Sequence, residues 1–176
     1  MGNPPREPVD AADAAHWEAV EEPVELLLER SHHEALYALR NVLKSDPRNP
    51  YAYYYTGTAL FEVGRFDECI HAYRAAIKLA PQYVAARVGL AQALRIAGEY
   101  HEAIKEARRA LDIAPNDGDA LFALGLAQAS VGNRNGAIAA LEAFLDTKPE
   151  VEVLMEASAM LDKLRSVGND SDDEPD

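Results

Sequence analysis

Apolar residues recur at helical spacing along most of the chain, in segments that turn-forming residues interrupt at regular intervals. In one such segment Leu60 and Val63 precede Gly64, and Ile70 and Ile77 follow it. Spacings of three, four and seven residues place apolar side chains on one face of a helix. A glycine allows the left-handed backbone that ends many helices. The pattern therefore predicts pairs of amphipathic helices separated by a glycine turn.

The whole pattern repeats every 34 residues. The repeated positions are the prolines Pro47, Pro81, Pro115 and Pro149, the glycines Gly64, Gly98 and Gly132, and the small residues Ala35, Cys69, Ala103 and Ala137. Proline cannot continue a helix, so each proline is expected just beyond the second helix of a unit. Asn49 and Asp117 are expected to cap the helices that follow them. Because one helix pair cannot bury its apolar face alone, neighbouring pairs are expected to stack.

The repeat divides the chain into units. We expect three full units at residues 50–83, 84–117 and 118–151, a degenerate N-terminal unit or cap at 16–49, and a C-terminal capping helix at 152–166. In the degenerate unit Pro23 interrupts the first helix, which is expected to run from about Trp17, and no glycine separates it from the second helix. Residues 1–15 and 167–176 are acidic and lack apolar periodicity, so we expect them to be disordered.

Charge excludes several classes of function. The chain has 176 residues and a net charge of −13. Residues 1–25 carry seven carboxylates and one arginine, and residues 166–176 carry five carboxylates and no base. Nowhere is there the basic block that binding to nucleic acid requires, and no apolar run approaches the ~20 residues that span a bilayer. We therefore expect no nucleic-acid partner, no membrane insertion and a cytoplasmic location.

The repeated columns resemble the tetratricopeptide repeat family. In the first unit the matching residues are Tyr53, Thr56, Gly57, Leu60, Cys69, Tyr73, Ala76 and Pro81. The resemblance implies an all-α, right-handed superhelical solenoid of about three full repeats, with the degenerate unit and the capping helix at its ends. It also implies a non-enzymatic scaffold or adaptor for protein–protein interaction, with no cofactor.

Candidate catalytic and metal-binding residues have simpler explanations. His32 and His33 are adjacent, so on a helix their side chains point about 100° apart and cannot share a cation. Cys69 is the only cysteine and stands in the column of small residues, which favours a packed, inert thiol. No catalytic triad, zinc motif or phosphate-binding loop appears. We therefore expect no enzyme activity and no bound metal.

The first helix of each unit is expected to line the concave face of the superhelix. A stripe at spacings i, i+3, i+7 and i+10 along these helices, with one neighbouring tyrosine, predicts a peptide-binding groove. Its residues are Tyr51, Tyr54, Tyr55, Thr58, Phe61, Val88, Gln92, Arg95, Phe122 and Leu126. Tyrosine gives a large contact area at low entropic cost, so the expected partner is a peptide or amphipathic helix with apolar or aromatic anchors.

Other interpretations of the same residues stay open. The aromatic residues at 51–55 could instead be core, covered by a helix around Trp17. Some members of the family grip a C-terminal carboxylate with basic and amide residues at groove positions. The matching positions here are Tyr54, Thr58, Gly89, Asp119 and Ala123, none of which suits that role. A chaperone-tail adaptor is therefore disfavoured.

Two alternative functions remain. The small size, the acidity and the extra N-terminal helix resemble chaperones of type III secretion translocators. A self-assembling structural scaffold is the second alternative, because stacked repeats can continue into a neighbouring molecule. Trp17 and the leucines at 26–28 would supply apolar surface for that contact. The composition therefore allows a homo-oligomer.

Overall fold

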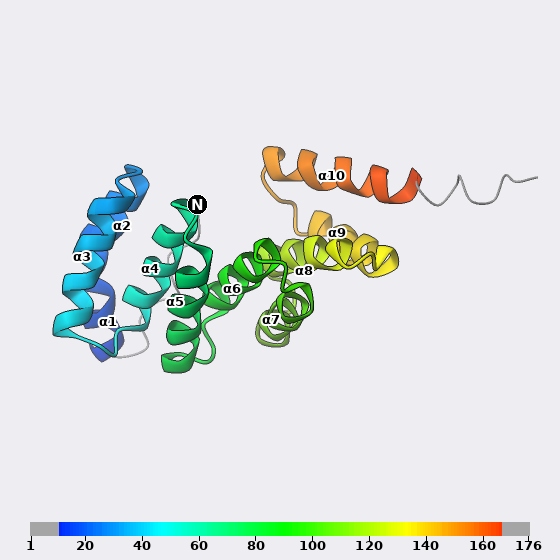
Figure 1. Ribbon diagram of the computed structural model, residues 1–176. Helices are drawn as coiled ribbons and strands as arrows, with labels where there is room; N and C mark the ends of the chain where they lie inside the picture. Colours follow the sequence, from blue (N-terminus) through cyan, green and yellow to red (C-terminus); the bar gives the residue numbers. More distant parts are fainter. Residues whose placement is uncertain (1–10, 167–176) are drawn as a thin grey trace, which may run out of the picture.

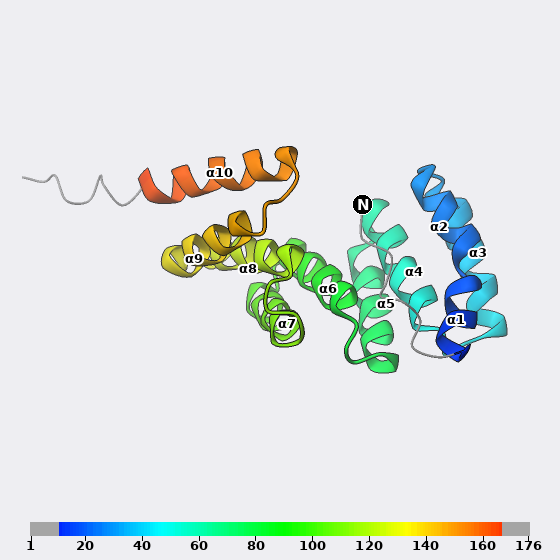
Figure 2. The same cartoon turned by 180° about the vertical axis from the view of Figure 1, so that it is seen from behind.

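The structure, a computed structural model, describes residues 11–166, which form ten α-helices and no strand. The helices are α1 (Ala11–Glu18), α2 (Glu21–Leu28), α3 (His32–Ser45), α4 (Pro50–Glu62), α5 (Phe66–Leu79), α6 (Val84–Ile96), α7 (Tyr100–Ile113), α8 (Gly118–Ser130), α9 (Arg134–Asp146) and α10 (Val151–Ser166). They follow one another in an elongated stack, with α1–α3 at one end and α10 at the other (Figures 1 and 2).

Three helix pairs, α4–α5, α6–α7 and α8–α9, correspond to the three predicted units and confirm an all-α repeat solenoid. Gly64, Gly98 and Gly132 have φ angles of +76°, +83° and +76° at the turns between paired helices, as the periodicity predicts. The predicted caps are also present. The Asn49 side chain accepts a hydrogen bond from the amide of Ala52, and the Asp117 side chain accepts one from the amide of Ala120.

The N-terminal unit differs from its prediction. Residues 11–15 belong to α1, whereas the sequence predicted a disordered tail over 1–15; residues 1–10 and 167–176 lie outside the described part of the chain. Contacts with α4 hold α1 in place, because Asn49 Nδ2 donates to the carbonyl of His16 over 2.8 Å and Tyr51 donates to Asp13 over 2.6 Å. The expected single helix is split into α1 and α2, and Pro23 stands in the first turn of α2, where its missing N–H breaks no helical hydrogen bond.

The degenerate unit makes its turn without a glycine. Arg30 stands 34 residues before Gly64 and adopts a φ of +61°, a left-handed conformation that costs an ordinary residue about 1 kcal/mol. Arg30→Gly is therefore expected to raise the free energy of unfolding by about 1 kcal/mol and the midpoint of thermal unfolding by roughly 2–4 °C. Circular dichroism during heating measures this midpoint.

Gly64→Ala provides the matched comparison. A Cβ at Gly64 would meet no atom within 4 Å, so only the backbone conformation opposes it. This variant is expected to unfold at a lower temperature than the wild type. An unchanged or lowered midpoint for Arg30→Gly would contradict our explanation of the turn.

The buried interior consists of contiguous clusters along the stack. The central cluster joins α4–α7 through residues such as Cys69, Tyr73 and Leu94. At the C-terminal end, Leu141 and Phe144 of α9 pack against Ala157 and Leu161 of α10. The first helices of the repeats are therefore fixed relative to one another by side chains of the second helices. No helix within residues 11–166 combines the length and the apolar character that a membrane crossing would need.

Candidate functional site

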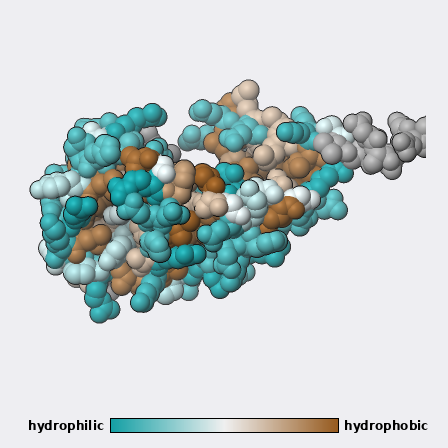
Figure 3. Space-filling model, viewed as in Figure 1, coloured by the Kyte–Doolittle hydropathy of each residue, from teal (hydrophilic) through white to brown (hydrophobic). Residues whose placement is uncertain are grey.

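A groove with a volume of about 670 Å³ opens along the first helices of the first two repeats. Tyr54, Thr58 and Phe61 of α4 line it, together with Val88 and Gln92 of α6. These five residues belong to the predicted stripe, and helical spacing brings them to one face as expected. Figure 3 shows the surface hollowed between the N-terminal helices and α10.

Tyr73 of α5 forms the floor of the groove between α4 and α6. A Cβ placed on Gly57 would lie 2.7 Å from the Tyr73 ring, and one placed on Gly89 would lie 2.6 Å from it. Glycine at both positions therefore lets the two first helices close on the ring. The Tyr73 hydroxyl lies 3.4 Å from Thr58 Oγ1. The periodicity did not identify Tyr73 as a groove residue because it belongs to a second helix.

Every charged side chain that lines the groove among the described residues is acidic. These are Glu62 at the end of α4, Asp117 and Asp119 at the start of α8, and Glu150 just before α10. Neighbouring residues displace part of the hydration of Asp119, which raises the pKa of its carboxyl, and the negative charge of Asp117 raises it further. This part of the groove therefore favours a cationic group, which would relieve the repulsion between the carboxylates.

Two predicted groove residues lie beneath α1 instead. Tyr51 is only 4% exposed, and its ring packs edge-on against Trp17 at 5.9 Å and Tyr83 at 5.6 Å. The Tyr55 ring lies between Trp17, at 6.1 Å, and Tyr54, at 4.9 Å. The interpretation that the N-terminal helix covers the aromatic residues is thus correct for Tyr51 and, in part, for Tyr55. The open groove begins at Tyr54.

The other three predicted residues also lie outside the groove lining. The Phe122 ring stacks at 4.9 Å on Phe144 and belongs to the C-terminal cluster with α10. Leu126 is partly buried on the same helix. Arg95, in the last turn of α6, is partly buried, and its Nε has no hydrogen-bond partner among the described residues. The groove lining therefore supplies no guanidinium for a carboxylate ligand.

The residues considered as a nucleophile or as metal ligands are either buried in the core or too far apart to act together. Cys69 is fully buried, as predicted for the column of small residues, and burial raises the pKa of its thiol to about 12. The thiol therefore stays protonated near neutral pH and is a poor nucleophile. Between residues 11 and 166, no three His, Cys, Asp or Glu side chains lie close enough together to hold a metal ion.

Stacked helix pairs with a groove along their first helices define the class of helical-repeat scaffolds. A family model described as "Tetratricopeptide repeat" matches residues 28–68 and 57–118, which together span just over half of the chain. The chain belongs to the tetratricopeptide repeat family. Its fold and family are those of protein-interaction scaffolds, which are typically non-catalytic.

Solved structures with the same fold include MamA from Desulfovibrio magneticus, residues 41 to the end, with a TM-score of 0.69 and 21% identity over 90% of this chain and 97% of that one. A thermophilic tetratricopeptide-repeat protein from Thermus thermophilus has a TM-score of 0.69 and 21% identity, over 85% of this chain and 80% of that one. YrrB, described as a tetratricopeptide-repeat protein with "an unusual peptide-binding site", also has a TM-score of 0.69 and 21% identity, over 85% of this chain and 75% of that one. No curated protein matches the chain.

Proposed function

We propose that this protein is a non-enzymatic scaffold that binds a short, positively charged segment of a partner protein in the groove between α4, α6 and the start of α8. The observation that carries the proposal is an open groove that has an aromatic wall and in which every charged lining residue of the described chain is acidic. The peptide-binding site described for YrrB, which shares this fold, supports the same type of activity.

The apolar part of the groove suits a large side chain of the partner. Phe61 and Tyr54 lie two helical turns apart on α4, and Val88 faces them from α6. Aromatic side chains that are already fixed in place contribute contact area without much loss of entropy on binding. Phe61 also contacts Phe66 at 5.6 Å, which holds its ring in position. The Gln92 amide can both donate to and accept from an extended peptide backbone.

The charged part of the groove determines which charge the bound segment of the partner should carry. Asp117, Asp119 and Glu150 lie at one end and Glu62 lies near Phe61, so a lysine or arginine beside an apolar anchor would find an opposite charge. An acidic or carboxylate-terminated segment would be repelled. This preference refines the sequence prediction, which specified apolar or aromatic anchors but no charge.

Selection from a library of randomised short peptides tests the proposal. The wild-type protein is expected to enrich peptides in which lysine or arginine accompanies an aromatic or large aliphatic residue. The double variant Asp119→Lys with Glu150→Lys is expected to lose this preference for lysine and arginine, because its two new bases balance Glu62 and Asp117 and leave the groove neutral. Phe61→Ala is expected to weaken the binding of an enriched peptide about tenfold, which corresponds to about 1.4 kcal/mol of binding free energy.

A matched control has the same change of net charge on the second helices. Asp67 of α5 and Asp112 of α7 are exposed and lie outside the groove lining, so Asp67→Lys with Asp112→Lys should leave the selected sequences unchanged. Enrichment of the same peptides by the wild type and by the groove variant would contradict the proposal. A wild type that enriches no peptide above background would contradict it equally.

A further inference from the structure

Helix α10 has the position of a first helix that lacks its partner. Helices α4, α6 and α8 begin at 50, 84 and 118, and α10 begins at 151, close to the same interval. Each earlier first helix packs against the second helix of its own unit, but no helix follows α10 within residues 11–166. The side of α10 that faces away from α9 therefore exposes Val151 (73%) and Met155 (66%), with Leu154 beside them.

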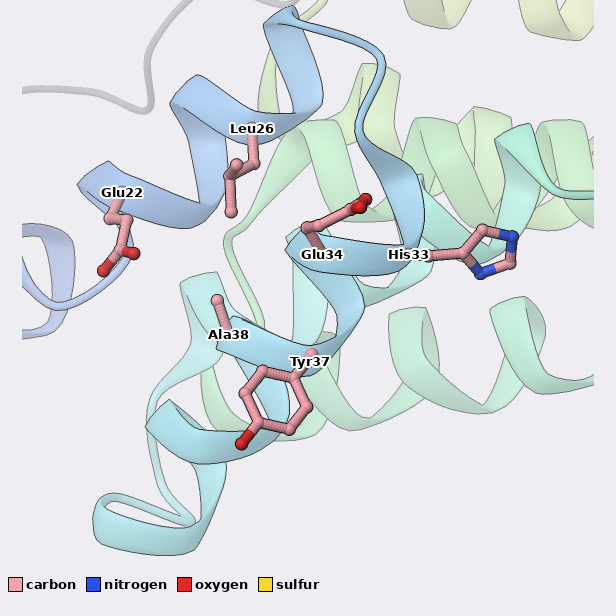
Figure 4. Close-up of a pocket in the computed structure, with 6 residues that line it drawn as sticks. All are labelled: Glu22, Leu26, His33, Glu34, Tyr37 and Ala38. Carbon is pink, nitrogen blue, oxygen red and sulfur yellow. The ribbon is translucent and has the colours of Figure 1, made fainter.

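At the opposite end of the stack, α3 is a second helix whose partner is too short to cover it. Helix α2 has eight residues, whereas α3 has fourteen. A hollow of about 470 Å³ lies between them, lined by Leu26, Ala38 and Tyr37, and a second hollow of about 360 Å³ continues along α3 to Ser45. In Figure 4 the Leu26 side chain extends from α2 toward α3, and the Tyr37 ring, 68% exposed, projects from α3.

The charges along α3 and α10 are complementary when the two helices run in opposite directions. Helix α3 has an acid near its start and bases in its second half, whereas α10 has acids in its first half and a base near its end. The residues concerned are Glu34, Arg40 and Lys44 of α3, and Glu152, Glu156 and Lys163 of α10. Within residues 11–166, none of these six side chains forms an ion pair. A parallel arrangement would place like charges together.

We propose that the exposed face of α10 of one copy docks antiparallel to α3, in the hollow between α2 and α3 of a second copy. The antiparallel direction is the one that joins first and second helices within each repeat. The apolar residues of α10 would cover Tyr37 and Leu26, and its charged residues would pair with those of α3, while Glu22 of α2, which also lines the hollows, would oppose the acids of α10. Such a head-to-tail contact leaves one free end on each copy, so the copies join into chains.

The contact is expected to be weak, because a single helix offers less surface than the ~800 Å² that each partner contributes to a standard interface. Sedimentation velocity of the full chain at low salt, over increasing protein concentration, measures it. The average mass of the wild type is expected to rise above that of the monomer. Met155→Glu, which puts a charge in the centre of the apolar contact, is expected to weaken association at least about tenfold.

Two charge-reversal variants make the test specific to this pair of surfaces. The first, Arg40→Glu with Lys44→Glu, makes the second half of α3 acidic. The second, Glu152→Lys with Glu156→Lys, makes the first half of α10 basic. Each variant alone should remain monomeric, because its own α3 and α10 carry like charges. A mixture of the two should associate, because every contact between unlike copies again joins opposite charges.

Circular dichroism confirms that each variant is folded, and Asp67→Lys with Asp112→Lys controls for the change of net charge in Glu152→Lys with Glu156→Lys. Recovery of association in the mixture, with the control behaving as the wild type, supports the proposal. A wild type that stays monomeric at every concentration overturns it. Association of either charge-reversal variant alone, or a folded mixture that remains monomeric, overturns it as well.

Discussion

Tyr73→Ala is expected to lower the free energy of unfolding by about 4 kcal/mol, within the range for removal of a buried aromatic side chain. The Tyr73 side chain is buried between α4 and α6, and its ring also contacts Tyr54 at 5.8 Å. Gly57 and Gly89 have no side chain that could move into the vacated space, so a cavity would remain beneath the groove. Urea unfolding followed by circular dichroism measures the loss.

Tyr73→Phe separates the contribution of the ring to stability from that of the hydroxyl. Among residues 11–166 the hydroxyl has only the long contact to Thr58, at 3.4 Å, so this variant is expected to lose less than about 1 kcal/mol. A loss of under 1 kcal/mol for Tyr73→Ala would contradict the packing described here. It would mean that α4 and α6 hold their positions without the ring between them.

Glu106→Ala is expected to lower the free energy of unfolding by about 3 kcal/mol. Glu106 of α7 pairs with Arg87 of α6 over 2.8 Å, and the two side chains are only 8% and 13% exposed. Arg87 also donates to the carbonyl of Pro81 over 2.8 Å, which holds the guanidinium in place. Removal of Glu106 therefore leaves a buried positive charge without its counter-charge, and equilibrium unfolding in urea measures the cost.

The third repeat suggests how to restore that stability. At the positions one period after Arg87 and Glu106 it carries Leu121 and Ala140. The double variant Arg87→Leu with Glu106→Ala is expected to be at least as stable as the wild type, because replacing a buried ion pair by apolar residues avoids the cost of desolvation. If the double variant is as unstable as Glu106→Ala alone, the buried charge is not the cause of the loss.

The sequence predicted the three central repeats well because their periodicity and their helix-ending residues agree. Gly64 and its counterparts end first helices as expected, and Asn49 caps α4. The N-terminal unit was harder to predict because its determinants are not periodic. Arg30 adopts a left-handed backbone conformation, which an arginine in the sequence does not predict. Helix α1 depends on a hydrogen bond between Asn49 and His16, which are 33 residues apart.

Only part of the groove was predicted, again because some of the contacts that form it are not periodic in the sequence. Helical spacing correctly grouped Tyr54, Phe61 and Val88 on one face, because that grouping is a local property of α4 and α6. Tyr51 has the same spacing but is covered by α1, which is a tertiary contact that periodicity cannot reveal. Asp119 was recognised as a groove position from the repeat, but Glu150 was missed because it belongs to a loop between later helices. Its approach to the groove depends on how the repeats stack.

The groove itself is tested most directly by an amide NMR titration of the protein with one peptide from the wild-type selection. We expect the changes in chemical shift to cluster on α4 at residues 54–62, on α6 at residues 85–92 and at Asp119. The amides of the hollow between α2 and α3 and of the exposed faces of α5 and α7 should remain unchanged. Shifts confined to those second helices or to that hollow would contradict a peptide-binding site on the first helices.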